Sequence, residues 1–153
     1  MMDVALYQPE IPQNTAAILR TAVCFGVDVR VIGPASFDAS DRGMRRAGLD
    51  YAARARVKLH ATFEELEVRA HRLVLFTTHA ADPLHTFAFE PTDTLLFGRE
   101  SAGVPDVIHA ACAHRVRIPM CPDARSLNLA SAVAIGLFHA LSATKMIDEK
   151  GLR

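Results

Sequence analysis

Short apolar runs alternate with longer segments of helical periodicity along the chain. The runs are typical of buried β-strands, because they are short, rich in aliphatic residues and often followed by Pro or Gly. The predicted strands cover residues 4–7, 27–32, 57–59, 73–76, 94–97 and 116–118. Strands that alternate with helices predict an α/β fold, with a mainly parallel sheet flanked by helices.

Helix start and stop signals lie between these runs. Asn14 or Thr15 is predicted to cap a helix that runs to Phe25, and Gly26 is its predicted stop. A capping-box pattern at Thr62 opens another helix. Further helices are predicted over residues 41–47, 62–70, 105–113 and 127–147.

Length and charge limit the possible classes of protein. The chain has 153 residues, half of them hydrophobic, which suits a single domain over residues 1–153 with a sizeable core. The formal net charge is +0, so the protein is not a bulk polycation. Any site for nucleic acid must therefore be a local patch.

Neither a membrane anchor nor a disulfide framework is expected. The most apolar stretch, residues 129–141, is interrupted by polar residues and is too short to span a bilayer, which takes about 20 apolar residues. No basic segment precedes an apolar run at the N-terminus, so no signal peptide is predicted. The irregular set Cys24, Cys112 and Cys121 favours a reducing cytoplasm.

The first predicted turn lacks the features of a dinucleotide-binding fold. Residues 8–14 contain no glycine, and the chain has no GxxxxGK[ST] phosphate loop. Glycines that would admit a ligand occur later, at Gly98 and Gly103. A cofactor site is therefore expected in the second half of the chain.

Three polar clusters follow predicted strand ends, where ligands bind in open α/β sheets. They are residues 12–15 with Arg20 on the following helix, residues 95–105, and residues 118–133. Each also has a purely structural explanation: a helix cap, an ordinary strand-to-helix turn, and a capped core helix. A metal site at His109, Cys112, His114 and Cys121 is not expected, because their spacing matches no standard zinc pattern.

Taken together, the three clusters resemble the three motifs of the SPOUT-class RNA 2′-O-methyltransferases, from residue 4 to about residue 140. The stretches 6–15 and 45–51 look like the branch that methylates the wobble nucleotide of tRNA, the tRNA (cytidine/uridine-34)-2′-O-methyltransferases. The resemblance implies a C-terminal trefoil knot, S-adenosylmethionine as cofactor, tRNA as substrate and a homodimer. Two alternatives stay open: an enzyme for another tRNA or rRNA nucleotide, and a non-catalytic knotted RNA-binding protein.

The resemblance also assigns roles to residues. It implies catalytic or substrate-orienting roles for Asn14, Arg20, Ser126 and Asn128. The cofactor would be held by Phe76, Thr77, Thr78, Gly98, Glu100, Gly103, Ile118, Met120, Ser126 and Leu127. The family's proposed base corresponds to Arg20, but arginine stays protonated. We therefore expect Arg20 to act as a cation that stabilises developing negative charge on the ribose oxygen.

The chain departs from the family pattern in a few places. Ala16 and Ala17 stand where a glycine is frequent, and Val104 replaces a leucine. Ala102 stands where a basic residue is frequent, and Phe138 where the wobble branch has a tyrosine. We therefore do not expect Ala102 to contact RNA. Any role that the tyrosine hydroxyl has in the wobble branch is not expected at residue 138.

Two surfaces are predicted for partners. Arginines and a lysine gather over residues 42–58, opposed within that segment only by Asp50, and we expect Arg42, Arg45 and Arg46 to contact RNA; a solvated basic face is the alternative. The apolar stripe of Leu129, Val133, Leu137 and Leu141 predicts a homodimer interface on the last helix.

Overall fold

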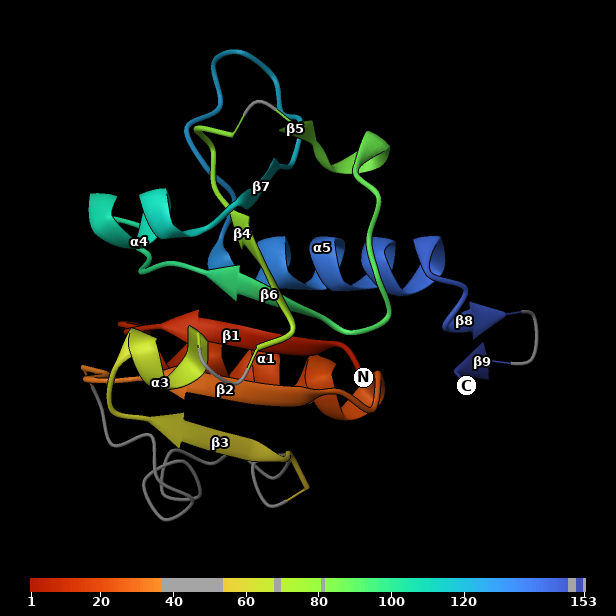
Figure 1. Ribbon diagram of the computed structural model, residues 1–153, viewed down its shortest axis with the longest axis horizontal. Coiled ribbons are helices and arrows are strands. Elements are labelled where there is room, and N and C mark those ends of the chain that lie inside the picture. The colour runs from red at the N-terminus through yellow and green to blue at the C-terminus, as the bar shows by residue number, and fades with distance from the viewer. Residues whose placement is uncertain (37–53, 68–69, 81, 149–150, 153) are drawn as a thin grey trace.

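The computed structural model describes residues 1–36, 54–67, 70–80, 82–148 and 151–152. Within these residues the central sheet has seven strands, in the order β3-β2-β1-β6-β4-β7-β5 (Figure 1). The strands are β1 Asp3–Tyr7, β2 Asp28–Ile32, β3 Val57–His60, β4 Arg72–Phe76, β5 Asp82–Pro83, β6 Asp93–Phe97 and β7 His114–Arg117. Every paired neighbour is parallel, so the predicted sheet is confirmed.

Helices cover both faces of this sheet. The helices are α1 Pro12–Cys24, α3 Phe63–Glu67, α4 Asp106–Ala111, α5 Leu129–Ala143 and the short 3₁₀ turn η1 Leu84–Thr86. Alternate strand residues divide between two apolar clusters: Val4 and Leu6 pack with α1 and α5, whereas Ala5 packs with α3 and α4. In Figure 1, α1 and α5 accordingly lie on the face of the sheet opposite α3 and α4.

The two long helices end in the same way, although only one end was predicted. In α1, Gly26 is left-handed (φ 62°) and Val27 N donates to Ala22 O, a Schellman motif that confirms the predicted stop. Lys145 takes the equivalent place after α5 (φ 57°), with Met146 N donating to Leu141 O. Because no glycine marks this end, the predicted helix over 127–147 was too long.

Several other predictions need correction. Helix α1 begins at Pro12, whose fixed φ suits the first helical turn, so neither Asn14 nor Thr15 is its cap. Strand β5 and the antiparallel pair β8 Ile147–Asp148 and β9 Gly151–Leu152 were not predicted, since two-residue strands carry too little pattern. The helix predicted over 41–47 lies outside the described residues.

The apolar stripe on α5 is not a free surface. Leu129 is 9% exposed, and Val133, Leu137 and Leu141 are fully buried in the chain's own core. The argument for a dimer from this stripe was therefore wrong, because α5 packs against α1 and the sheet. The large apolar side chains that α5 exposes are Ile135 and Phe138.

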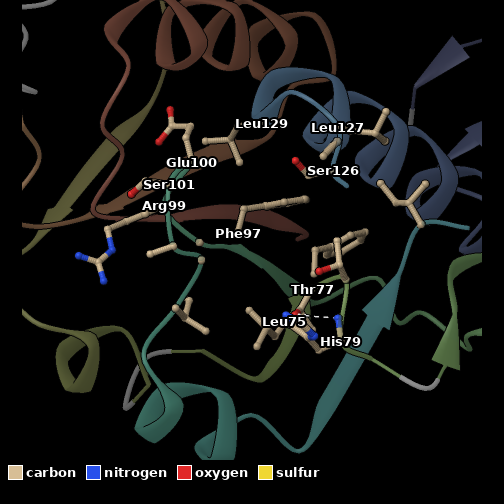
Figure 2. A pocket seen from close by; sticks show the side chains of 18 of the residues that line it. Leu75, Thr77, His79, Phe97, Arg99, Glu100, Ser101, Ser126, Leu127 and Leu129 are labelled. Carbon is tan, nitrogen blue, oxygen red and sulfur yellow. Dashed lines mark hydrogen bonds between the residues drawn. The ribbon is translucent and has the colours of Figure 1, made fainter. Parts of the chain in front are cut away.

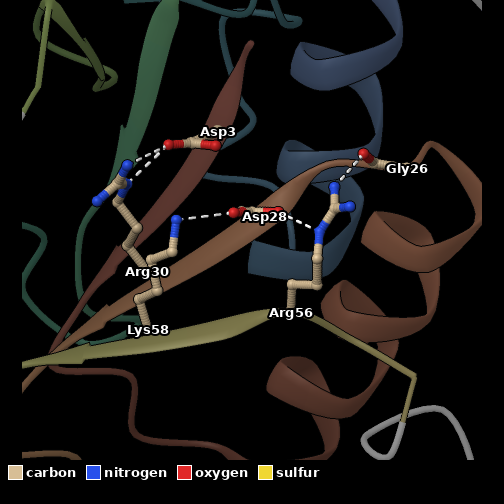
Figure 3. A network of polar contacts seen from close by, with 6 residues as sticks. All are labelled: Asp3, Gly26, Asp28, Arg30, Arg56 and Lys58. Atoms are coloured by element: carbon tan, nitrogen blue, oxygen red, sulfur yellow. Dashed lines mark hydrogen bonds and ion pairs between the residues drawn. The ribbon is translucent and has the colours of Figure 1, made fainter.

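Ion pairs gather at the edge of the sheet where the strands begin. Arg30 donates to Asp3, and Asp28 accepts hydrogen bonds from both Arg56 and Lys58 (Figure 3). The basic residues of segment 42–58 are therefore opposed not only by Asp50 but also by Asp28, from β2. Two of the positive charges in the expected RNA-binding segment are thus already engaged within the protein.

The most buried ion pair at this edge joins β4 to β6. Asp93 is completely buried, and Arg72 donates to its two carboxylate oxygens at 2.6 and 2.8 Å. The hydrogen bond from Arg72 to Asp93 is the main reason why the pKa of Arg72 is raised. Among the described residues, no helix is long and apolar enough to cross a membrane.

Candidate functional site

A pocket of about 700 Å³ lies at the opposite edge, where the parallel strands end. Loops that follow β4, β6 and β7 form its walls together with the starts of α1 and α5 (Figure 2). Phe76 and Phe97 stack beside it with ring centroids 4.5 Å apart. All the residues predicted to hold a cofactor line this one pocket: Phe76, Thr77, Thr78, Gly98, Glu100, Gly103, Ile118, Met120, Ser126 and Leu127.

The Gly98–Gly103 loop requires its glycines. A Cβ on Gly98 would lie 2.4 Å from the Gly103 carbonyl carbon, closer than any real contact. Gly103 itself is left-handed (φ 64°), and its N–H and C=O exchange hydrogen bonds with Arg99. The loop is therefore a closed turn with its own backbone folded tightly against itself, which gives the pocket a preformed wall.

Asn128, Asn14 and Glu100 form a hydrogen-bonded chain, which we call the amide–carboxylate chain. Asn128 caps α5 by accepting from Ala130 N and Ser131 N, so its amide nitrogen is left to donate to Asn14 Oδ1 at 2.8 Å. Asn14 in turn donates to Glu100 Oε1 at 3.1 Å. Each contact fixes the direction of the next, and the chain ties α5, α1 and the Gly98–Gly103 loop together.

The Glu100 carboxylate faces the start of α1. Besides Asn14, it accepts hydrogen bonds from Glu10 N at 2.9 Å and Ile11 N at 3.2 Å. Backbone N–H groups at a helix start have no partner within the helix and favour a carboxylate. Glu100 lines the pocket, but its carboxylate oxygens already accept hydrogen bonds from these three donors.

Glu10 makes the reciprocal contact, which sequence reasoning missed. Its carboxylate accepts from Ser101 N at 2.9 Å and from Ser101 Oγ at 2.8 Å. The hydrogen bond from the Ser101 N–H is the main reason why the pKa of Glu10 is lowered. The Glu10 carboxylate thus accepts from the Gly98–Gly103 loop, and the Glu100 carboxylate accepts from the segment before α1. These pairings are about ninety residues apart in sequence, and no local pattern reveals them.

The structure does not bring every predicted residue to the pocket. Arg20 lies on α1 and is exposed, and it is not among the residues that line the pocket. Asn128 does line it, but its amide oxygen caps α5, as the structural explanation anticipated. Ser126 lines the pocket and is exposed. Arg42, Arg45 and Arg46 lie outside the described residues.

Sequence reasoning also overlooked pocket residues beside those it named. Ser101 lies in a loop whose neighbours Gly98 and Glu100 had been singled out, so the signal was present in the same motif. His109 lines the pocket and contacts Arg115 through Nδ1 at 3.3 Å. In the part of the chain that the structure describes, no three His, Cys, Asp or Glu side chains gather as a metal site would require.

Comparison with known proteins matches this architecture to RNA methyltransferases. The sequence model of the SpoU rRNA Methylase family matches residues 1–138. A tRNA (cytidine(34)-2′-O)-methyltransferase of Beijerinckia indica subsp. indica is 47% identical over 142 residues, which are 90% of this chain and 89% of that protein.

Two solved structures extend the comparison. A structure that concerns 2-OH methylation of C/U34 on tRNA has a TM-score of 0.86 and 38% identity, and the match covers 95% of this chain and 97% of that one. The SpoU methyltransferase AviRb from Streptomyces viridochromogenes, in complex with AdoMet, has a TM-score of 0.81 and 26% identity. That match covers 93% of this chain and 57% of AviRb.

Proposed function

Because this chain belongs to the SpoU rRNA Methylase family, we propose that it transfers a methyl group from S-adenosylmethionine to the ribose 2′-hydroxyl of nucleotide 34 of tRNA. The reaction makes it a tRNA (cytidine(34)-2′-O)-methyltransferase, whose target is cytidine or a modified uridine. The observation that carries the proposal is that one pocket at the strand ends gathers all the predicted cofactor residues. Identity over most of both chains to relatives of that name supports the choice of nucleotide.

The residues around the pocket fit S-adenosylmethionine. A volume of about 700 Å³ lies within the range of small-molecule sites, which is about 300–1,000 Å³. Phe76, Ile118 and Met120 offer an apolar surface for adenine, and the tight Gly98–Gly103 turn lets a ligand approach the backbone. When bound, the cofactor supplies an activated methyl group on a sulfonium.

The protein's own part is to position the substrate and stabilise charge. The amide–carboxylate chain holds the start of α1 against the pocket wall, so that the element carrying Arg20 has a fixed position. Arg20 supplies a permanent cation for the developing negative charge on the ribose oxygen. Since Arg20 does not line the pocket of its own chain, this role fits a pocket contributed by a second copy.

A homodimer and a knotted C-terminal half belong to the same proposal. Ile135 and Phe138, which are 42% and 54% exposed on α5, supply apolar surface for a second copy. The knot is supported by family membership and by the segment 118–128, which shares the pocket with the loops after β4 and β6. Light scattering at micromolar concentration tests the dimer, and a monomer would contradict it; a crystal structure whose traced chain is unthreaded would contradict the knot.

The remaining parts of the proposal concern conditions and location. We expect cofactor binding without added metal and a protein that acts in the cytoplasm, where tRNA is available. Calorimetry of S-adenosylhomocysteine with chelator-treated protein tests the first point. No heat of binding would contradict it.

The enzyme activity is tested by methyl transfer from labelled S-adenosylmethionine to purified tRNA. We expect transfer to tRNA that lacks the 2′-O-methyl group at nucleotide 34 and none to a tRNA with a 2′-deoxyribose at that nucleotide. Arg20→Ala is expected to abolish transfer while leaving S-adenosylhomocysteine binding within about twofold, and Arg20→Lys is expected to restore little, because a point charge does not replace a planar fork. Transfer that is unaffected by the deoxyribose would move the target to another nucleotide.

A further inference from the structure

Among the described residues that line the pocket, Arg99 is the only lysine or arginine. It forms no ion pair with any described residue, and its Nε is buried without a hydrogen-bond partner. A buried donor left without a partner costs free energy, and a guanidinium is always charged at physiological pH. The chain therefore keeps at this pocket a permanent cation that forms no ion pair with any described residue.

The position of this cation is set by an aromatic ring. The Arg99 guanidinium carbon lies 5.9 Å from the centroid of the Tyr7 ring, at the end of β1. In Figure 2 the Arg99 side chain points away from Ser126 and Thr77, which lie on the other side of the pocket. A guanidinium over the face of a ring is attracted by the ring and keeps its N–H groups as donors.

Glu10 and Glu100 form no ion pair with Arg99. Glu10 is close enough for the charge of Arg99 to contribute to its lowered pKa, after the hydrogen bonds from Ser101. Its oxygens accept from Ser101 N and Ser101 Oγ, and those of Glu100 accept from three N–H groups near the start of α1. Both acids are held by other donors, so the guanidinium fork is open to an external anion.

We propose that Arg99, which lies over the Tyr7 ring, binds a backbone phosphate of the RNA substrate at the mouth of the pocket. A phosphate presents two oxygens that match the guanidinium fork. This inference rests on the proposed function, because it takes RNA as the substrate. Arg99 would then be an RNA contact beside the pocket, in the described part of the chain and separate from the basic segment 42–58.

The other anion that could reach Arg99 is the carboxylate of the cofactor. The direction of the side chain favours the phosphate, because Arg99 turns away from the loop of Ser126 and Leu127 and toward the end of β1. That side also carries the start of α1, the helix on which Asn14 and Arg20 lie. RNA that presents its ribose to α1 would pass its phosphate beside Arg99.

The test is the affinity of an RNA hairpin carrying the anticodon loop, measured across a salt series. Arg99→Gln is expected to weaken RNA binding by about tenfold at low salt. The slope of log affinity against log salt should also become shallower by about one. Arg99→Lys should keep most of the slope but lose part of the affinity, because it keeps the charge without the planar fork.

Two further variants separate this contact from general effects. Tyr7→Leu removes the supporting ring and is expected to cost about two- to threefold in RNA affinity with the salt slope unchanged. Lys145→Gln removes the same charge beyond the far end of α5 and should change neither the affinity nor the slope by a comparable amount. S-adenosylhomocysteine is the second probe, and its affinity should stay within about twofold in every variant.

Each other outcome overturns the proposal in a recognisable way. Weaker S-adenosylhomocysteine binding with unchanged RNA binding would assign Arg99 to the cofactor carboxylate. A loss that depends on the base at nucleotide 34 and not on salt would indicate a base contact. If Arg99→Gln changes neither affinity, Arg99 binds no anion. Wild-type protein that binds neither probe would instead refute the proposed function.

Discussion

The two edges of the parallel sheet hold their polar groups in different ways. Where the strands begin, carboxylates pair directly with cations: Asp3 with Arg30, Asp28 with Arg56 and Lys58, and Asp93 with Arg72. Where the strands end, Glu10 and Glu100 accept backbone, hydroxyl and amide donors. Arg99, which lies over the Tyr7 ring and forms no ion pair with any described residue, is at this second edge.

This difference separates stability from function within one sheet. Ion pairs at the starting edge join neighbouring strands, and the side chains that form them already pair with one another. At the edge where the strands end, hydrogen bonds of the Asn and Glu side chains fix the positions of the loops. A pocket of about 700 Å³ lies between these loops. Substitutions at the first edge should therefore change the free energy of unfolding, and those at the second should change binding or turnover.

The largest effect is expected at the starting edge, from Asp93→Ala. It leaves the guanidinium of Arg72 without its buried partner, which typically costs about 3–5 kcal/mol of the free energy of unfolding. Urea unfolding followed by circular dichroism measures this change. If Asp93→Ala lost activity but kept a free energy of unfolding close to wild type, the edge where the strands begin would serve function and not stability, which contradicts this account.

A large loss of activity with little loss of stability is expected at the other edge, from Asn14→Asp. The new carboxylate would face Glu100 Oε1, which Asn14 now contacts at 3.1 Å, and repulsion would displace the start of α1. A shift of about 1 Å can lower turnover by about 100-fold. Methyl transfer under saturating cofactor measures the loss, and Asn14→Ala, which adds no charge, is the control. Equal activity of Asn14→Asp and wild type would show that the amide–carboxylate chain does not position α1.

A smaller effect on cofactor affinity is expected from Gly98→Ala. The added methyl would meet the Gly103 backbone at 2.4 Å, so the turn must open. S-adenosylhomocysteine binding should weaken by about tenfold, because the preformed wall of the pocket is lost. Gly33→Ala is a suitable control, since its Cβ would meet its nearest neighbour at an ordinary 3.6 Å. Unchanged affinity in Gly98→Ala would mean that the loop does not contact the cofactor.

The smallest effect is expected from Asp28→Asn. Burial raises the pKa of Asp28, but hydrogen bonds from Lys58 and Arg56 outweigh this and lower it below its ordinary value of 3.8. A lowered pKa stabilises the folded state above the unfolded value and is lost as pH falls through the folded value. With both partners more than half exposed, we expect less than about 1 kcal/mol at pH 7 and none in strong acid. A difference between variant and wild type that grows toward low pH would contradict this sign.

Sequence patterns predicted the strands better than the contacts between loops. The five-residue apolar strands β1 and β6 were recognisable because burial on both faces demands continuous apolar runs. The end of α5 was not, because Lys145 adopts a conformation that usually calls for glycine. Glu10 was missed because its partner Ser101 is ninety-one residues away.

In the candidate site, too, local stretches were predicted better than the contacts between loops. Family motifs named the pocket residues in advance, since each motif is a continuous stretch such as 98–103. They did not reveal that Asn14 binds Glu100 and Asn128, because hydrogen-bond partners depend on how separate loops meet. The prediction that the apolar stripe on α5 forms a dimer interface failed for a related reason. Periodicity identifies an apolar helix face but does not say what covers it.

The most direct test of the central claim is mass spectrometry of tRNA from cells with and without the gene. The account predicts that 2′-O-methylation at nucleotide 34 disappears from specific tRNAs when the gene is deleted. It predicts that wild-type protein restores the modification and that Arg20→Ala does not. Unchanged methylation at nucleotide 34 in the deletion strain would contradict the proposed function.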